Sequence, residues 1–366
     1  MRSQYGGTAQ RTSHTTFQIK PQVHSHTMVT YAQVQASNET IASQLTGPLV
    51  AVFIGATSGI GEHSVKRFAK RTKNAKIYLL GRSQAAADRI KGEIDAFGTG
   101  TQLEFLPADL SLIRNVDKIC AEIQAKEKAI NVLFMSQGNA NFRTKTEEGL
   151  NSLWAVGFFG RLRFIHNLVP QLSAASGLRR VVSVLAGTKE GPVYPEDLQG
   201  SKVSLVQTRG HLVSAFTLSL EQIAAKNPTI SFVHDYPGFV RGSLLRDYPL
   251  VQAFLPVAWT FTRLTGLGGY VEETESGERH VFLATSVRYP PASPGESSAQ
   301  GVPLVDGLAV SIGTDGKPGS GVYVADEACE AGNAKVVAVL EGHRQKGYGP
   351  KIFATVQQEW ARITSA

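Results

Sequence analysis

Short apolar segments alternate with longer amphipathic segments from residue 49 onward. Residues 49–54 form an unbroken apolar run, which is typical of a strand buried on both faces of a parallel sheet. Further strands are predicted at residues 77–80, 103–107, 131–135, 180–185 and 229–234, and helices at residues 60–71, 84–97, 112–126, 147–172 and 205–226. This alternation predicts an α/β fold in which a doubly wound, Rossmann-like parallel sheet carries helices on both faces.

The rest of the chain lacks this alternation. Residues 1–27 contain no Asp or Glu and few large apolar side chains, so we expect a disordered N-terminal extension, with Met28 as a candidate start of the folded protein. Residues 28–286 are expected to form one Rossmann-like domain. Residues 287–320 are rich in Pro, Gly and Ser and predict a flexible loop, and residues 321–366 predict a strand and a helix that complete the domain as a C-terminal cap.

Composition excludes several classes of protein. The 366 residues include 37 Lys+Arg and 30 Asp+Glu, and this basic excess is spread along the chain, so we expect no nucleic-acid partner. A basic cluster at residues 66–71 is expected to be a solvated helix face. No run of about 18 uncharged apolar residues occurs, so no transmembrane span is expected.

The cysteines point to a reducing compartment. Cys120 and Cys329 are the only two, and they lie far apart in the sequence. This excludes a disulfide scaffold and a clustered zinc site, so we expect no metal. Both thiols are expected to be packing residues of a cytoplasmic protein.

A glycine-rich turn joins the first predicted strand to the first predicted helix. Glycines let the backbone approach a pyrophosphate closely, and the N-terminus of the helix supplies unpaired N–H groups. Because this turn follows a buried strand and opens a helix, it predicts a dinucleotide site. The expected binding residues of the turn are Gly55, Thr57, Ser58, Gly59, Ile60 and Gly61.

The end of the second predicted strand indicates which dinucleotide is bound. Arg82, followed by Ser83, stands where a carboxylate would favour NAD(H), and its guanidinium suits a 2′-phosphate. We therefore expect NADP(H). Asp109 and Leu110 are expected beside the adenine, and Gly138 beside the adenosine ribose.

Several of these segments resemble the short-chain dehydrogenase/reductase superfamily. The resemblance rests on residues 55–61, 81–83, 109–111 and 237–240, and it covers about residues 48–245. Residues 181–191 and 227–234 resemble a fungal branch of that superfamily that is often found in secondary-metabolite pathways. The resemblance implies an NADP(H)-dependent oxidoreductase of biosynthesis.

The catalytic residues implied by the resemblance are missing. The family uses a tyrosine as general acid/base, a lysine four residues later, a serine and an asparagine. Alignment on neighbouring residues places Gly157 at the asparagine, Ala186 at the serine, Val206 at the tyrosine and Gly210 at the lysine. Ser183 lies in a different register from the serine, and no Tyr-x-x-x-Lys occurs in residues 186–245.

Two functions other than that of a redox enzyme stay open. A non-redox isomerase, cyclase or dehydratase on the same scaffold is one alternative, and a non-catalytic nucleotide-binding sensor is the other. If hydride transfer is retained, the replacement proton donor is unknown. The weak candidates are Tyr194, His211 and Tyr236. Their alternative interpretations are a cover for the pocket for Tyr194, a surface histidine for His211 and a packing residue for Tyr236. Lys189 and Asp235 are expected near the same pocket.

An apolar segment follows the Pro237-Gly238 turn. Residues 242–270 are expected to form a substrate lid, with a core helix as the alternative. A lid of this kind fits a hydrophobic small-molecule substrate such as a polyketide or terpenoid intermediate. The sequence leaves the oligomeric state open.

Overall fold

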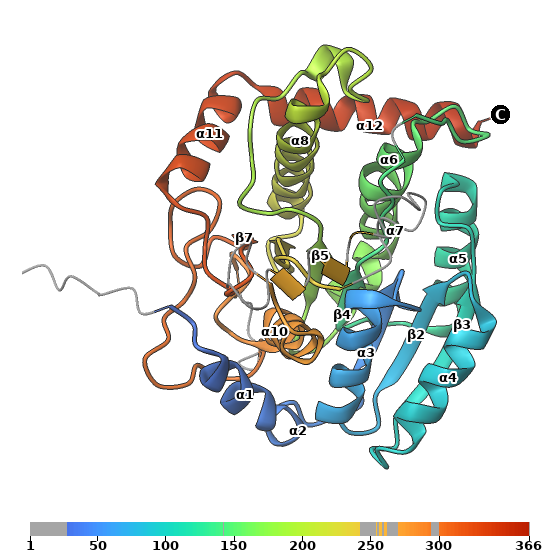
Figure 1. The fold of residues 1–366 in the computed structure, drawn as a ribbon, viewed down its shortest axis with the longest axis vertical. Helices are drawn as coiled ribbons and strands as arrows, with labels where there is room; N and C mark the ends of the chain where they lie inside the picture. The colour runs from blue at the N-terminus through green and yellow to red at the C-terminus, as the bar shows by residue number, and fades with distance from the viewer. Residues whose placement is uncertain are drawn as a thin grey trace, which may run out of the picture.

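The central feature of the fold is a parallel sheet. The computed structural model describes residues 28–141, 143–241, 254, 256–257, 260–261, 270–293 and 300–365. In these residues the sheet has seven strands in the order β3-β2-β1-β4-β5-β6-β7, all parallel (Figure 1). In chain order they are β1 (Val50–Ile54), β2 (Lys76–Gly81), β3 (Gln102–Pro107), β4 (Val132–Met135), β5 (Arg180–Val184), β6 (Ser231–Asp235) and β7 (Val322–Ala325). The predicted doubly wound sheet is confirmed.

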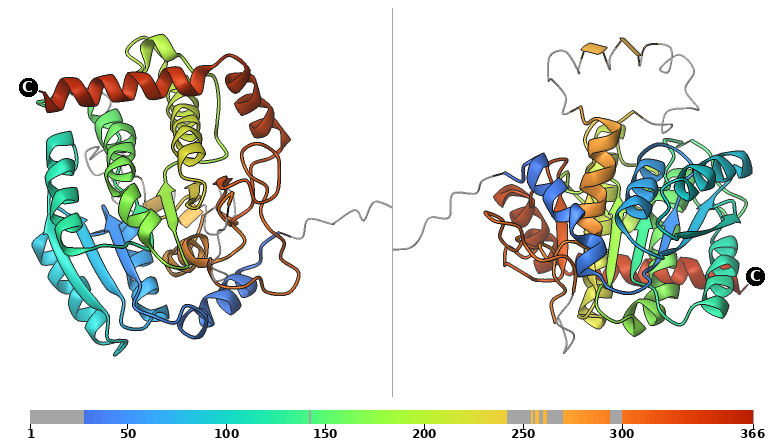
Figure 2. Two further views of the ribbon diagram at one scale, coloured as in Figure 1. Left: turned by 180° about the vertical axis from the view of Figure 1, so that it is seen from behind. Right: turned by 90° about the horizontal axis from the view of Figure 1, so that it is seen from below.

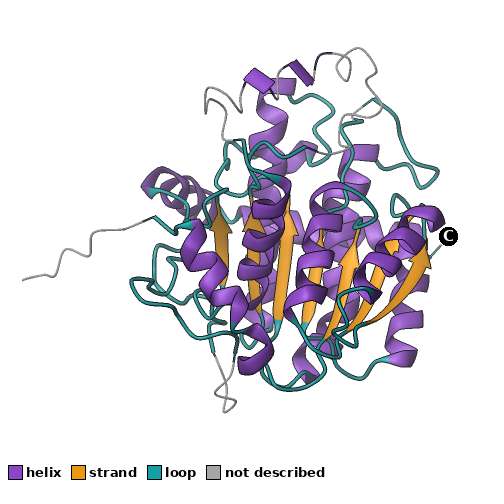
Figure 3. Ribbon diagram, turned by 60° about the horizontal axis from the view of Figure 1, so that its bottom comes forward, coloured by secondary structure: helices purple, strands orange, loops and turns teal. Residues whose placement is uncertain are grey.

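Helices cover both faces of the sheet (Figure 3). One face packs against α3 (Gly59–Arg71), α4 (Gln84–Asp95) and α10 (Glu273–Thr285), and the other against α5 (Ile113–Lys126), α7 (Gly160–Ala174) and α8 (Leu205–Lys226). Alternate residues of each strand enter opposite cores, so that Phe53 packs on the first face and Val52 on the second. Both faces are therefore buried, which explains the unbroken apolar runs.

The helix predicted over residues 147–172 begins later than expected. It starts with α6 (Ser152–Trp154), continues through one π-helical turn, η1 (Ala155–Phe159), and only then becomes α7. Glu148 is the reason for the late start, because its carboxylate accepts hydrogen bonds from the N–H groups of Ile113 and Arg114 at the N-terminus of α5. The residues before α6 therefore form a turn that caps another helix.

Two short helices precede the sheet and were not predicted. These are α1 (Tyr31–Glu39) and α2 (Ile41–Gln44), and α1 lies beside α10 (Figure 1). The buried Asn38 side chain donates hydrogen bonds to the Glu278 carbonyl oxygen at 2.8 Å and to its Oε2 at 2.7 Å. Polar contacts of this kind leave no apolar stripe in the sequence.

The prediction of a solvated basic face on α3 is wrong. Helix α10 packs against α3, and Arg71 forms an ion pair with the buried Glu278 at 3.0 Å. Arg67 donates a hydrogen bond to the Thr274 hydroxyl at 3.2 Å. Arg67 and Arg71 therefore hold a second helix in place, and of this cluster Lys70 is exposed as predicted.

The C-terminal part completes the fold. Helix α11 (Ala334–Gln345), which was not predicted, leads to α12 (Tyr348–Thr364), and α12 crosses α8 and α5 on the outside of the molecule (Figure 2). Residues 287–293 and 300–320 contain no helix or strand, as expected of a loop, yet they bury Tyr289 and Val302. None of the described helices has the length and apolar content that crossing a membrane requires.

Candidate dinucleotide and substrate site

The site lies at the carboxyl edge of the sheet, between β1 and β4. These strands are neighbours, but the chain leaves β1 toward β2 and leaves β4 toward β5, so the loops that follow them diverge. A crevice at such a switch point is where open α/β sheets bind ligands.

Glycines allow the loops at this edge of the sheet to pack closely. Gly55 has φ +74°, and a Cβ on it would lie 2.5 Å from the Cα of Gln137. A Cβ on Gly61 would lie 2.7 Å from the Cα of Ala56. The loop after β1 therefore packs directly on the loop after β4 and on the first turn of α3, and no larger residue fits at either position.

The remaining residues of the predicted turn lie at the start of α3. Ser58 is the N-cap in extended conformation, and Gly59 (φ +57°), Ile60 and Gly61 form the first turn. The N–H groups of a first turn have no acceptor inside their helix. The acidic residue of this turn, Glu62, is paired with Lys66 and Arg89 at 2.9 and 2.8 Å. The turn is therefore able to accept an anionic ligand.

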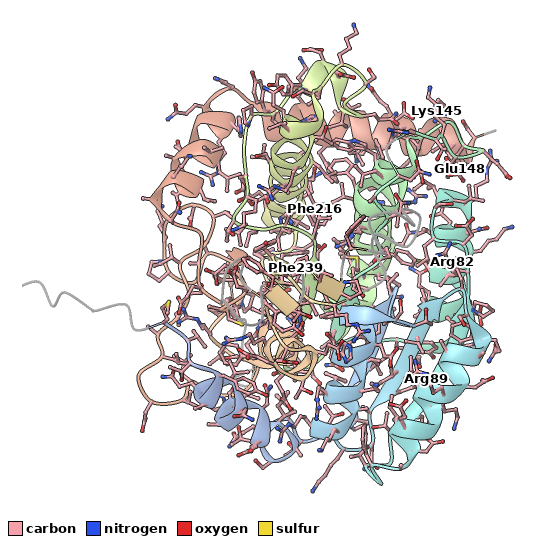
Figure 4. All side chains as sticks on the ribbon, in the orientation of Figure 1. Arg82, Arg89, Lys145, Glu148, Phe216 and Phe239 are labelled. Atoms are coloured by element: carbon pink, nitrogen blue, oxygen red, sulfur yellow. The ribbon has the colours of Figure 1, made fainter. Side chains whose placement is uncertain are left out.

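Arg82 follows β2 at the same edge. Its side chain is exposed and has no hydrogen bond or ion pair with any described residue. Arg89, on α4, instead pairs with Glu62 and Glu93 (Figure 4). Ser83 caps α4, because its Oγ accepts a hydrogen bond from the N–H of Ala86 at 3.2 Å. Arg82 is thus a cation without a counter-ion at the predicted 2′-phosphate position.

The other predicted nucleotide contacts lie on the next loops. Asp109 is exposed, and its carboxylate accepts hydrogen bonds from the N–H and hydroxyl of Ser111 at 3.0 and 2.7 Å. Leu110 is buried, and Gly138 is exposed. Gln137 is buried, and both polar atoms of its side chain lack a hydrogen-bond partner among the described residues.

Thr57 lies between these loops and the end of β2. A Cβ on Gly81 would lie 2.5 Å from the Cγ2 of Thr57. The glycine turn and the segment that carries Arg82 are therefore in direct contact.

The four positions aligned with the family's catalytic residues hold no acid or base. Gly157 lies in η1, and a Cβ there would meet nothing within 4 Å, so the missing asparagine would have space. Ala186 is buried, and Val206 is 92% exposed. A Cβ on Gly210 would lie 3.0 Å from the Cα of Gly191, which leaves no room for a lysine.

A buried polar cluster lies under the loop that follows β5. The hydroxyl of Thr217 donates to Glu190 Oε1 at 2.9 Å, and His234 Nδ1 lies 2.8 Å from the same hydroxyl oxygen. Both the Glu190 and His234 side chains are fully buried. Burial raises the pKa of Glu190 to about 7 and lowers the pKa of His234 to about 3. The cluster therefore has a neutral imidazole and a carboxyl group that titrates near neutrality.

A second buried polar cluster, around Arg161, connects the ends of β4 and β5 by hydrogen bonds. Arg161 is buried without a carboxylate, and burial lowers its pKa to about 9. Its guanidinium donates to Ser183 Oγ at 2.6 Å, to the Met135 carbonyl at 3.3 Å and to the Gln137 carbonyl. Ser183 is thus buried within β5 and hydrogen-bonded to Arg161, whereas Ala186, at the position of the missing serine, lies beyond the end of the strand.

His211 is not a surface histidine. It is fully buried in α8, and its Nδ1 accepts a hydrogen bond from the Tyr194 N–H at 3.3 Å. Its Nε2 lies 3.0 Å from the Leu198 carbonyl oxygen, beside the short 3₁₀-helix η2 (Pro195–Asp197). The Tyr194 ring packs edge-on against the imidazole at 5.5 Å. His211 and Tyr194 therefore attach this loop to α8.

Tyr236 and Lys189 are brought together, whereas Asp235 is occupied elsewhere. The Lys189 Nζ lies 4.3 Å from the centroid of the Tyr236 ring. The buried Asp235 carboxylate pairs with His280 Nε2 at 2.8 Å. Asp235 and His280 line a small cavity of about 10 Å³ that Arg279 and Cys329 also border.

Neither cysteine is activated. Cys120 and Cys329 are buried free thiols, and burial raises the pKa of each to about 12. The part of the chain that the structure describes contains no group of three or more His, Cys, Asp or Glu side chains placed to hold a metal ion.

The predicted lid lies mostly outside the described residues. Of residues 242–270, the structure describes 254, 256–257, 260–261 and 270. Phe254, Val257 and Phe261 are 72%, 70% and 57% exposed.

Sequence signals for the unexpected residues were weak. Glu190 and His234 each lie within a family-like segment, but their pairing through Thr217 depends on three separate elements. Arg161 looks like a surface arginine on an amphipathic helix, and only the structure shows that it is buried.

Comparison with known proteins gives the family. The model of the short chain dehydrogenase family matches residues 49–196. Oxidoreductase andH of Emericella variicolor is 33% identical over 342 residues, which cover 93% of this chain and 99% of that protein. Short-chain dehydrogenase/reductase SAT2 of Stachybotrys chartarum is 30% identical over 262 residues, covering 65% and 73%.

A solved structure shares the fold. The structure of YwfH, titled as an NADPH dependent reductase involved in bacilysin biosynthesis, has a TM-score of 0.51 and 15% identity, covering 65% of this chain and 92% of YwfH. Together with the glycine turn and the parallel sheet, the similarity to SAT2 and the match to the short chain dehydrogenase model show that this chain belongs to the short-chain dehydrogenase/reductase superfamily of oxidoreductases.

Proposed function

We propose that the protein is an NADP(H)-dependent oxidoreductase that acts on a hydrophobic small molecule in fungal secondary metabolism. The observation that carries the proposal is the close-packed glycine turn at the start of α3 together with Arg82, an exposed guanidinium without a counter-ion among the described residues. A dinucleotide with a 2′-phosphate matches both features.

The residues present fit such a cofactor. The glycine turn with Gly55 and Gly61 presents backbone without side chains to a pyrophosphate, the first turn of α3 offers N–H groups, and Arg82 offers a bidentate donor for the 2′-phosphate. Asp109, Leu110 and Gly138 would border the adenosine. When bound, the nicotinamide supplies or accepts a hydride.

The relatives support an oxidoreductase, and the exposed apolar side chains support a hydrophobic substrate. The relatives andH and SAT2 carry the names of an oxidoreductase and a short-chain dehydrogenase/reductase. Exposed Phe254, Val257 and Phe261 belong to the segment that follows the Pro237-Gly238 turn, and an apolar substrate would cover such side chains. Two buried free thiols agree with a cytoplasmic location.

One observation favours a second candidate function, that of a non-redox enzyme. Gly157, Ala186, Val206 and Gly210 remove the usual proton-transfer groups, as a non-redox isomerase, cyclase or dehydratase would allow. The mass of the product separates the two. A product that differs from its substrate by two hydrogens, formed with oxidation of NADPH, supports the oxidoreductase, and an isomer formed without the cofactor supports the alternative.

Arg82→Glu tests the choice of cofactor. The change replaces a phosphate partner with a repelling charge, so the Kd for NADPH should rise roughly 10- to 100-fold, as expected for loss of a hydrogen bond to a charged group. The Kd for NADH should change much less. Lys91→Gln is the matched control, because Lys91 is an exposed cation on the same helix, α4, that pairs with Asp95, and its loss should leave both affinities unchanged. Equal weakening of NADPH and NADH by Arg82→Glu contradicts the 2′-phosphate assignment.

A further inference from the structure

Tyr236 and Lys189 form a tyrosine–lysine pair that does not lie on one helix. Tyr236 follows β6 directly, before Pro237 and Gly238, and Lys189 lies on the loop after β5. Their strands are neighbours in the parallel sheet, so both residues emerge at its carboxyl edge. The 4.3 Å between the Lys189 Nζ and the ring centroid places the ammonium in contact with the aromatic face.

The two loops are held together by the backbone. A Cβ at Gly187 would overlap the carbonyl oxygen of His234, so the loop after β5 packs tightly on the end of β6. The N–H of Tyr236 donates to the Ala325 carbonyl of β7 at 2.8 Å. Thr188 has φ +70°, a strained conformation for a β-branched residue, and it sets the direction of the loop just before Lys189. The pair therefore sits on a defined backbone.

The polar atoms of the pair are not used by the fold. The Tyr236 hydroxyl makes no hydrogen bond with the described residues, and Lys189 has no carboxylate partner among them. Both residues are partly exposed. The hydroxyls of Tyr78, Tyr289 and Tyr323, in contrast, donate to Glu127, to the Cys329 carbonyl and to the Pro290 carbonyl. Tyr236 has a phenol group that is available to a ligand.

We propose that Tyr236 is the catalytic proton donor of this enzyme and that Lys189 is the residue that positions and stabilises it, in place of the missing Tyr-x-x-x-Lys. The inference rests on the proposed oxidoreductase function. In the reducing direction, the carbonyl carbon of the substrate accepts a hydride from NADPH, and the C=O π bond becomes a lone pair on oxygen. The Tyr236 O–H bond breaks, its proton forms the O–H bond of the alcohol, and solvent reprotonates the phenolate.

The electrostatics suit a proton donor. Burial raises the pKa of Tyr236, and the charge of Glu327 adds to this effect while Arg209 opposes it. The phenol is therefore protonated at neutral pH. Three charged side chains face Tyr236: Lys189 on the β5 loop, Arg209 on α8 and Glu327 after β7. The preceding residue, Asp235, is paired with His280. Arg209 favours the phenolate that forms when the proton leaves, and the Lys189 ammonium, 4.3 Å from the ring centroid, is the second cation beside the phenol.

The other candidate acids are less suitable. Glu190 and His211 are buried, and each is hydrogen-bonded to the segment that it anchors. Asp235 is paired with His280. None of them presents a proton at the surface of the crevice.

The first test needs no substrate. Tyrosine ionisation is followed by ultraviolet difference absorbance during a pH titration of the wild type and of Tyr236→Phe, and the difference isolates Tyr236. Lys189→Met should raise the pKa of Tyr236 by at least about half a unit, because a neighbouring cation favours the phenolate. Lys346→Met is the matched control, since the Lys346 Nζ lies 5.8 Å from the Tyr348 ring, away from the site. An unchanged titration of Tyr236 in Lys189→Met overturns the pairing.

The second test uses two probes that differ in their need for a proton. Reduction of α-tetralone forms a strongly basic alkoxide, whereas reduction of 9,10-phenanthrenequinone forms a weakly basic hydroquinone anion. Tyr236→Phe should slow ketone reduction by about 10²- to 10⁴-fold and quinone reduction far less, with the Kd for NADPH unchanged. Tyr348→Phe should leave both rates unchanged.

The outcomes separate the two proposals. Ketone reduction at the wild-type rate by Tyr236→Phe overturns the inference and leaves the oxidoreductase function standing. Failure of the wild type to bind NADPH overturns the proposed function. If the wild type binds NADPH but reduces neither probe, the titration decides whether the pair exists.

Discussion

Glu190 gives the molecule a pH-dependent stability that one substitution should remove. Its side chain is fully buried, and burial raises its pKa from 4.5 to about 7. The folded state therefore holds the proton more tightly than the unfolded chain does. Stability from this group is fully present below pH 4.5, falls as the pH rises toward 7, and is constant above that.

The magnitude follows from the two pKa values. Each pKa unit corresponds to about 1.4 kcal/mol, so the free energy of unfolding of the wild type should fall by about 3 kcal/mol between pH 4.5 and 7.5 through Glu190 alone. His234 acts in the opposite direction. Its pKa is about 3 in the folded state, so its contribution is present above pH 6.5 and is lost as the pH falls. Only a difference between variants isolates Glu190.

The assay is urea denaturation of the wild type and Glu190→Gln from pH 4.5 to 7.5. The glutamine keeps the shape of the protonated carboxyl group and its hydrogen bond with Thr217. The free-energy difference between the two proteins should shift by about 3 kcal/mol in favour of Glu190→Gln as the pH rises. Glu147→Gln, at an exposed position without a recorded partner, is the control and should show a constant difference. A constant difference for Glu190→Gln as well would refute the buried, raised-pKa carboxyl.

Two further predictions concern packing. Gly55→Ala should weaken NADPH binding and lower the free energy of unfolding by about 1–3 kcal/mol, because its Cβ would lie 2.5 Å from the Gln137 Cα at φ +74°. The control Gly92→Ala lies in open space on α4 and should instead raise the free energy of unfolding by about 0.5–1 kcal/mol. Equal effects of the two substitutions in urea denaturation would contradict this prediction. Asn38→Ala should cost about 1.5–3 kcal/mol in the same assay, because it removes buried hydrogen bonds to Glu278, and a cost below 0.5 kcal/mol would show that α1 is not held there.

The sheet and the nucleotide turn were predictable because local sequence determines them. Residues 49–54 are apolar since both faces of β1 are covered, and this pattern is visible without the fold. Gly61 is required by a contact with Ala56 in the same βαβ unit, whereas the contact that requires Gly55 is with Gln137, which follows β4. The expected role of Arg82 as a phosphate partner follows from its place after β2 in the sequence.

Contacts between distant segments could not be predicted. Helix α1 is held to α10 through Asn38 and Glu278, which are polar residues that look like surface positions in the sequence. The same holds for Arg161, which is buried against the carbonyl groups of two other loops. Lys189 and Tyr236 were each considered as candidates, but their contact depends on the pairing of β5 with β6.

The nucleotide site is tested most directly by thermal denaturation of the wild-type protein with NADPH, with NADH and without ligand. A nucleotide that binds only the folded state, at about 100 times its Kd, should stabilise it by about 2.7 kcal/mol. We expect a clear rise in Tm with NADPH and a much smaller one with NADH at equal concentration. An unchanged Tm with both nucleotides would contradict the assignment of the crevice beside Gly55 and Arg82 as a dinucleotide site.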